Sequence, residues 1–492
     1  MHSYSSTPSS APQPAALGLV VGTAILAPLP GFEFVLGGGY HDTQRWMELM
    51  AFAGIAVLAW VRLARGTPAL PPGWGWEARS LVLSGLLGLG SAGAAALPAH
   101  AFFEWGVFFF LWLAAWLMAG EVAQARAGLL ERVLSWVVAG SLLYGFKALV
   151  AYVAALLSGA QPDPANLIPG FDTYRFFNHG QTVTLPLLGL YVCLQAGKVA
   201  RSRGWLAAGW MALVVWWMLL FASAGRGTLV AMAVVMVAAG VGRGSRAWPW
   251  VRTMAWGALA GGAAYVLLYM AVPQWLGLES FGFFGGIVQR SVDNFGSSRG
   301  SLWACAIQMV IQNPWLGAGP LHYAQVCAPL QVAAHPHNWV LQIAAEWGLL
   351  ALGCIGAALL LAFRALHGCG AVLDERDERN QAMLTCWLAT GIAIVLDGLV
   401  SGLLVMPVSH LWIASYAGLA WGWVRAVRPP SGGPPVAASL PWRCFAGGVI
   451  LAAAGLLTVG VAATLASAHS AESEGLRLAP RAWGSGFFGV LR

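Results

Sequence analysis

The chain has 492 residues, of which 59% are hydrophobic and only 9% are charged. Soluble proteins carry about 25% charged residues, so this composition excludes a soluble globular enzyme. The net charge of +7 comes almost wholly from the connections between apolar segments, and no basic domain stands apart from them. We therefore predict no nucleic-acid partner.

Apolar segments of about 20 residues recur along the whole chain, and each is long enough to cross a bilayer as a helix. Because backbone polar groups in a bilayer must be satisfied within each segment, we predict an all-α polytopic membrane protein of about 12–13 transmembrane helices. Residues 1–14 contain no Lys or Arg and lack the charged region of a cleavable signal peptide, so we expect the first span to be retained. The predicted spans are 15–36, 46–63, 80–97, 101–119, 132–157, 181–197, 205–223, 227–242, 251–272, 336–364, 381–402, 406–425 and 444–467.

The Lys and Arg residues set the predicted orientation. With residues 1–14 inside, the inner connections hold 17 basic residues and the outer side holds eight. This excess satisfies the positive-inside rule, which the opposite orientation fails. The eight outer arginines run against the topological preference, so we expect them to have another role. They are Arg45, Arg175, Arg226, Arg290, Arg299, Arg477, Arg481 and Arg492.

We predict a single integral membrane domain, 1–492, with one large outer loop at 273–335 and a short C-terminal tail at 468–492. Cys305 and Cys327 both fall in this loop. A disulfide between them would suit an oxidising compartment, although the sequence leaves their separation open.

The outer loop contains a stretch, Ser298 to Gln312, with apolar residues at helical spacing. These residues are Leu302, Ala306, Met309 and Val310. Asn313-Pro314 ends the stretch, and Gly317-Ala318-Gly319-Pro320 forms a turn. The pattern predicts a helix that lies at or over the membrane surface.

The run His335-Pro336-His337-Asn338 opens the predicted span 336–364. Pro336 suits the first position of a helix, so His337 is expected in the first turn, among unpaired backbone N–H groups. The positive helix end favours a nearby anion and disfavours the imidazolium. We therefore predict that His337 is neutral and able to accept a proton.

Asn338, Gln342 and Glu346 follow one another at four-residue spacing and form one polar stripe. Such a stripe in a membrane helix is typical of a side that faces a cavity. A helix cap with hydrogen bonds between helices is the alternative. His322 and His335 are further candidates in the loop, and either is otherwise interpreted as a surface residue.

Three arginines lie at predicted outer helix ends. Arg226 follows Ser223-Ala224-Gly225 in a short turn whose glycines would let the backbone approach a ligand. Arg299 opens the loop helix, Arg175 precedes the sixth span, and Arg290 is a supporting candidate. A guanidinium binds phosphate oxygens in a two-pronged way, and several together neutralise a diphosphate without a metal. The alternative for each is an interfacial arginine that extends towards the headgroups.

Lys147 and Asp397 fall inside predicted spans, where a charge is costly unless it is paired or faces water. We expect a structural ion pair, with a proton pathway of a transporter as the alternative. The sequence contains no GxxxxGK[ST] loop, no HExxH and no outer pair of carboxylates for a divalent cation, so we predict neither ATP use nor a metal or other cofactor. The energy must then come from an activated donor.

Three ordered motifs resemble the bacterial O-antigen ligases and their relatives, the O-antigen polymerases and the protein O-oligosaccharyltransferases. The resemblance covers about residues 170–350. The motifs are 223–228, 298–303 running to 313–319, and His337-Asn338 with Leu341-Gln342 and Glu346-Trp347-Gly348. The turn before Arg226 departs from the usual SxSRG pattern, because Ala224-Gly225 stands there.

The resemblance implies a GT-C-like glycosyltransferase in the bacterial inner membrane, with an active site that faces the periplasm. Such an enzyme joins a glycan from undecaprenyl diphosphate to lipid A–core oligosaccharide, inverts the anomeric centre and uses no metal. The essential histidine of the family maps to His337, its essential arginines map to Arg226 and Arg299, and Arg175 is a further match. An O-antigen polymerase or a protein O-oligosaccharyltransferase is the alternative within the enzyme class. A lipid-linked glycan transporter is the alternative outside it.

Overall fold

The computed structural model describes residues 14–30, 39–66, 75–125, 128–159, 167–196, 203–280, 298–330, 332–429, 439–473 and 480–486. These residues form helices and connections without a strand, and nine of the described helices are long and apolar enough to cross a membrane. The predicted all-α polytopic architecture is confirmed. The helices are α1 (Ala15–Leu26), α2 (Gly39–Ala64), α3 (Trp76–Ala94), α4 (Pro98–Ala123), α5 (Leu129–Leu157), α7 (Tyr174–Ala196), α8 (Arg203–Ser223), α9 (Arg226–Arg243), η2 (Gly244–Arg246), α10 (Trp248–Tyr265), η3 (Val266–Ala271), α11 (Val272–Trp275), α13 (Ser298–Gln312), α14 (Tyr323–Val326), η4 (Ala328–Leu330), α15 (Trp339–Cys369), α16 (Glu378–Gly398), α17 (Pro407–Val427) and α18 (Leu440–Ser473).

Twelve of the thirteen predicted spans overlap one helix each, and the span 251–272 overlaps α10, η3 and α11, which are continuous over Trp248–Trp275. The largest difference is at the first span, predicted as 15–36, because α1 ends at Leu26 just before two prolines, Pro28 and Pro30. The helices α1, α3, α7 and α17 coincide with predicted spans but are not among the nine, so fewer helices reach full membrane length and hydropathy than the sequence suggested.

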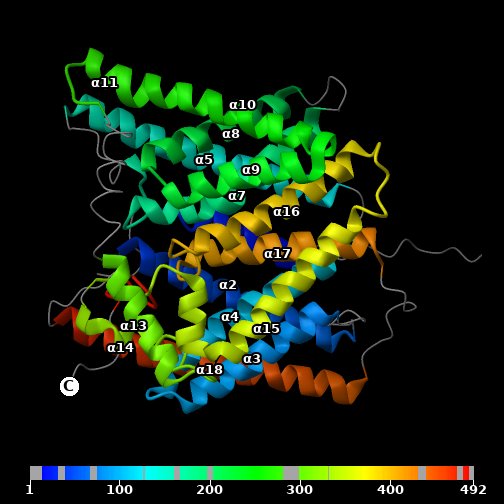
Figure 1. The fold of residues 1–492 in the computed structure, drawn as a ribbon, viewed down its shortest axis with the longest axis vertical. Helices are drawn as coiled ribbons and strands as arrows, with labels where there is room; N and C mark the ends of the chain where they lie inside the picture. The colour runs from blue at the N-terminus through cyan, green and yellow to red at the C-terminus, as the bar shows by residue number, and fades with distance from the viewer. Residues whose placement is uncertain are drawn as a thin grey trace, which may run out of the picture.

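The helices form one bundle, with α16 and α17 between two groups (Figure 1). On one side α7, α8, α9 and α10 pack together, and on the other α4 packs with α3, α17 and α18. The short helices α13 and α14 lie at one end of the bundle, where α13 packs against the start of α15.

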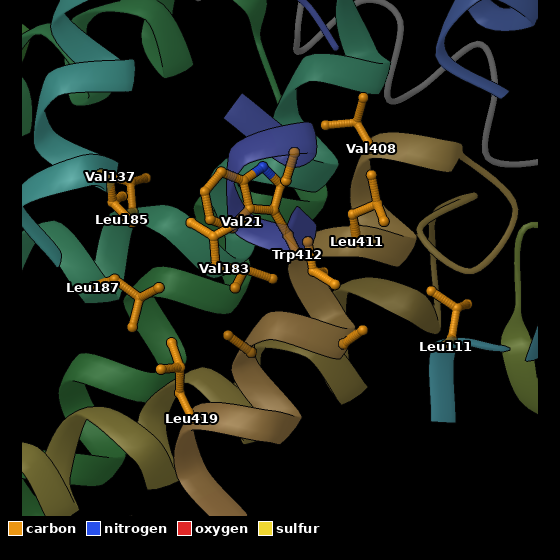
Figure 2. Close-up of a cluster of buried hydrophobic side chains, with 14 of the residues drawn as sticks. Val21, Leu111, Val137, Val183, Leu185, Leu187, Val408, Leu411, Trp412 and Leu419 are labelled. Carbon is orange, nitrogen blue, oxygen red and sulfur yellow. The ribbon is translucent and has the colours of Figure 1, made fainter. Parts of the chain in front are cut away.

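The core between the two groups is packed by large side chains and close helix contacts. Figure 2 shows Trp412 of α17 among apolar residues that include Val21 of α1 and Val183 of α7. Four residues apart on the same helix, Gly418 and Gly422 leave no space for a Cβ against α4. Small residues at this spacing let helix backbones approach closely, and the van der Waals contact then holds the helices together.

The bundle has two polar ends. At one end the Arg62–Glu121, Arg379–Glu131 and Arg246–Glu375 ion pairs join helices and connections that the sequence places on one membrane face. We call this the opposite end, because it lies across the bundle from α13 and α14. At the other end lie α13, α14 and the starts of α9 and α15, and we call it the site end.

The loop after α13 is locked into a break in α15. Gly348 interrupts that helix with φ 84° and ψ 167°, and the freed N–H of Leu349 donates to the Pro314 carbonyl at 2.8 Å. A Cβ on Gly348 would lie 2.1 Å from the Trp315 carbonyl oxygen, and one on Gly317 would lie 2.4 Å from the Glu346 carbonyl. The crossing therefore requires glycine at both positions.

Gly348→Ala is expected to lower the free energy of unfolding by about 2–4 kcal/mol, because it combines a left-handed backbone with overlap against a carbonyl. Thermal unfolding of the detergent-purified protein measures the effect. Gly353→Ala, on the same helix with open space at the Cβ position, is the control and should not lower stability. Equal midpoints for the two variants would show that the crossing tolerates a side chain.

Candidate active site

His337 lies just before α15 and not in its first turn. The helix begins at Trp339, and Asn338 is its N-cap, whose side chain accepts a hydrogen bond from the Leu341 N–H at 3.1 Å. The predicted helix start at Pro336 is therefore wrong, because the carboxamide of Asn338 satisfies a free helical N–H, as an N-cap does and a proline ring does not. His337 itself has φ 53°, which is uncommon for a residue other than glycine.

Three arginines and a second histidine lie at the same end of the bundle as His337. Arg299 is the second residue of α13, Arg175 the second of α7, and Arg226 the first of α9. Arg299, His179 and Arg175 each lower the pKa of His337, while Arg226 and Arg175 lower the pKa of Arg299. Each of these five side chains thus affects, or is affected by, at least one other, and we call this group at the site end the cation cluster.

The environment keeps His337 neutral near pH 7. Burial, followed by the charges of Arg299, His179 and Arg175, lowers its pKa from 6.5 to about 4. The sequence attributed a neutral His337 to the positive end of a helix. The structure attributes it mainly to burial and to the surrounding cations. A neutral imidazole beside guanidinium groups can accept a proton where an anion is held.

Two arginines of the cluster, Arg175 and Arg299, are available for an anion. Arg175 and Arg299 are exposed, and Arg226 and His337 are partly exposed. Arg299 donates to the Val400 carbonyl at 3.1 Å, and the Arg175 guanidinium lies 5.8 Å from the Tyr174 ring centre. Within the described residues, neither Arg175 nor Arg299 forms an ion pair with a carboxylate, so their charges are not neutralised there.

Other side chains pack closely against the glycines on both sides of Arg226. A Cβ on Gly227 would lie 2.2 Å from Asp397 Oδ1, and one on Gly225 would lie 2.5 Å from the Asn178 carboxamide. The prediction that these glycines admit a ligand is wrong, because protein side chains fill the space beside them.

The sequence suggested an ion pair between Asp397 and Lys147, but the two residues have different partners in the structure. The Thr182 hydroxyl donates to Asp397 Oδ2 at 2.9 Å, and His179 Nδ1 lies 3.8 Å from the same oxygen. Lys147 instead donates to the carbonyls of Pro28 and Pro30, at 3.0 and 3.2 Å. The chain after α1 presents carbonyls without helical partners, and the ammonium group satisfies them.

The helix α13 agrees with its prediction in bounds and in buried face. Leu302, Ala306 and Met309 are buried against α14 and α15. A disulfide joins Cys305 of α13 to Cys327, which follows α14. These contacts fix the helix that carries Arg299.

The remaining predicted site residues in the loop have different outcomes. His335 is buried, with its ring centre 4.1 Å from that of His337, and its Nδ1 accepts the His337 backbone N–H at 3.3 Å. His322 is also buried, with Nε2 accepting from the Leu97 N–H at 3.1 Å. Neither is a surface residue. Arg290 lies outside the described residues.

The comparison with known families bears on this same group of residues. The family model described as O-antigen ligase matches residues 206–356, a range that contains Arg226, Arg299 and His337. This region is similar to the O-antigen ligase family. The match supports a ligase- or polymerase-type glycosyltransferase of lipopolysaccharide synthesis. No curated protein matches the chain significantly.

Two members of the cation cluster, and a carboxylate beside one of them, lie outside the matched region. Arg175 and His179 come from α7, before that region, and Asp397 comes from α16, after it. We had expected Asp397 in a structural ion pair with Lys147. In the described part of the chain, no group of three His, Cys, Asp or Glu side chains is arranged to hold a metal ion.

The polar stripe of α15 does not face an open cavity. Gln342 Nε2 donates to Glu104 Oε1 at 3.3 Å, and Glu346 Oε2 accepts from Arg481 Nη2 at 2.6 Å. Together with the N-cap role of Asn338, these contacts support the alternative of a cap and hydrogen bonds between helices. The stripe therefore holds helices together at the site end.

Proposed function

We propose that the protein transfers a glycan from undecaprenyl diphosphate to lipid A–core oligosaccharide at the periplasmic face of the bacterial inner membrane. The observation that carries the proposal is the cation cluster, which groups three arginines with a neutral histidine. Arg226, Arg299 and His337 of this cluster lie within the region that matches the O-antigen ligase family. Guanidinium groups bind diphosphate oxygens, and the imidazole supplies a base beside them.

The proposed reaction is a single displacement that needs no metal. His337 removes the proton from an acceptor sugar hydroxyl, and that oxygen attacks the anomeric carbon from the side opposite the diphosphate. The bond between the anomeric carbon and the diphosphate oxygen breaks, which inverts the anomeric centre and releases undecaprenyl diphosphate. Arg175, Arg226 and Arg299 stabilise the negative charge of the leaving group.

Two observations support a periplasmic orientation for the site end. The Cys305–Cys327 disulfide suits an oxidising compartment, which the periplasm is and the cytoplasm is not. The excess of basic residues on the connections of the opposite end follows the positive-inside rule for a cytoplasmic face.

The test is reconstitution of the purified protein with undecaprenyl diphosphate-linked glycan and lipid A–core, without ATP and with a chelator. Formation of the joined glycolipid supports the proposal. Lengthening of the donor glycan in the absence of lipid A–core would instead identify a polymerase, and transfer to a peptide would identify a protein O-oligosaccharyltransferase. Movement of intact donor across vesicles without transfer would identify a transporter.

The acid limb of kcat is expected at higher pH than that of kcat/KM for the donor. In the free enzyme burial, followed by the cations, holds the pKa of His337 at about 4. Bound diphosphate offsets the arginine charges, so the pKa of His337 rises in the complex. Because only neutral His337 accepts a proton, each rate falls as the pH decreases through the corresponding pKa. Initial rates measured from well below the free-enzyme pKa up to neutral pH define both limbs, and coincident limbs would contradict the coupling.

A further inference from the structure

A segment beyond the last long helix returns to the bundle and places an arginine in its interior. Residues 480–486 follow α18, and the Arg481 side chain is 3% exposed. Its Nη2 donates to both oxygens of Glu104, at 2.9 and 2.7 Å, and to Glu346 Oε2 at 2.6 Å. One guanidinium therefore joins α4 to α15 at the site end.

Arg481 also contacts the segment that carries His337. Its Nη1 donates to the Ala334 carbonyl at 3.3 Å. The next residue, His335, accepts the backbone N–H of His337 at 3.3 Å and packs against its ring. Only two contacts thus separate the Arg481 guanidinium from the backbone of the proposed base.

A second path leads from Arg481 to the helix that carries Arg299. Glu346 Oε2 accepts a hydrogen bond from Arg481, and Glu346 Oε1 accepts one from the backbone N–H of Tyr323 at 2.9 Å. The Tyr323 hydroxyl donates to the Leu302 carbonyl of α13 at 3.0 Å. Both halves of the cation cluster, His337 and the start of α13, are therefore tied to the same guanidinium.

The backbone around Arg481 is held as firmly as its side chain. Arg45 donates to the Arg481 carbonyl at 3.0 Å and to the Ala482 carbonyl at 3.1 Å. The Gly484 N–H donates to Asp42 Oδ1 at 2.6 Å, and Trp483 Nε1 donates to the Thr464 hydroxyl at 2.9 Å. Because its main chain is anchored to α2 and α18, the guanidinium has little freedom to move away from its partners.

We propose that Arg481 is a positioning residue, which holds the His337 segment and α13 in the relative placement that transfer requires. A buried arginine with two carboxylates is a poor source of stability, because desolvation of the charges offsets their attraction. Its geometry is nevertheless specific, since a planar guanidinium fixes the direction of each partner. This inference rests on the proposed function, because the effect it predicts is on glycan transfer.

The test separates positioning from folding with charge-matched variants. Removing Arg481 alone would leave two buried carboxylates without a cation, so the informative variant is Arg481→Met with Glu104→Gln and Glu346→Gln. We expect this triple variant to insert and fold, to bind the donor, and to show a kcat lower by about 100-fold, as misplacement of a base by about 1 Å does. Arg481→Lys, which keeps the charge but not the forked geometry, should show an intermediate loss of about 10-fold.

The matched control is Arg62→Met with Glu121→Gln, which removes the ion pair between α2 and α4 at the opposite end. It should lower thermal stability and leave kcat unchanged. Wild type and His337→Ala are assayed in parallel. A folded triple variant with the kcat of wild type, beside an inactive His337→Ala, would overturn the positioning role and leave the proposed function intact. If the triple variant does not fold, an Arg481→Lys variant with the kcat of wild type would overturn the positioning role. Absence of transfer by wild type would overturn both.

Discussion

Replacing His337 with Ala is expected to lower kcat for glycan transfer by about 10²–10⁴-fold, the usual contribution of a general base. The donor should still bind, because Arg175, Arg226 and Arg299 remain in place and the lost side chain is neutral near pH 7. The expected pattern is a large fall in kcat with little change in the dissociation constant of the donor. Initial rates with saturating acceptor and a separate equilibrium binding measurement distinguish the two quantities.

The backbone conformation of His337 calls for a second variant that tolerates it. With φ at 53°, alanine is strained there, whereas asparagine adopts the left-handed region more readily. His337→Asn therefore removes the base and keeps the local conformation, and it should lose as much activity as His337→Ala. His367→Ala, at an exposed position near the other end of α15, is the control and should transfer normally. Near-normal turnover of either His337 variant would refute the base assignment.

The elements that could be predicted from the sequence are those determined by local pattern. Apolar length fixes the helices because a span must satisfy its own backbone, and the spacing of Leu302, Ala306 and Met309 gives both the bounds and the buried face of α13. The helix start near His337 was misplaced because two local signals compete there. Proline favours the first helical position, but the Asn338 side chain caps the helix two residues later.

The contacts that hold the site could not be obtained from local pattern. Arg481 meets Glu104 across 377 residues and Glu346 across 135, so no spacing along the chain reports either pair. Asp397 and Lys147 looked alike as isolated charges within spans, but their partners are a threonine and two carbonyls. Such choices depend on helix packing, which the sequence of one chain does not reveal.

One signal in the sequence could have separated the structural arginines from those of the cation cluster. Glu48, Glu104 and Glu346 fall within apolar helices, and a buried carboxylate requires a cationic partner at the same depth. Arg45 and Arg481 meet that requirement in the structure. Arg175 and Arg299 are left without a carboxylate among the described residues. An anionic ligand accounts for their positions better than helix packing does.

Neutralising Arg299 is the second change with a large expected effect. Arg299→Ala should lower kcat/KM for the donor by about 10²–10³-fold, because the leaving diphosphate loses one of its charge-stabilising groups. Arg299→Lys keeps a point charge without the forked geometry and should fall between Ala and wild type. Arg379→Ala removes an exposed arginine that pairs with Glu131 at the opposite end, and it should leave kcat/KM unchanged.

Arg299→Ala also tests the electrostatic link between Arg299 and His337. Arg299 is the first of the charges that hold the pKa of His337 at about 4, so its removal should raise that pKa towards 6.5. Because the base must be neutral, the acid limb of kcat/KM should move to higher pH in Arg299→Ala, and to a smaller extent in Arg299→Lys. A loss of rate with no movement of the limb would mean that Arg299 binds the donor but does not act on His337. If Arg299→Ala keeps the kcat/KM and the acid limb of wild type, Arg299 does not belong to the site. The diphosphate would then have to be bound by Arg175 and Arg226.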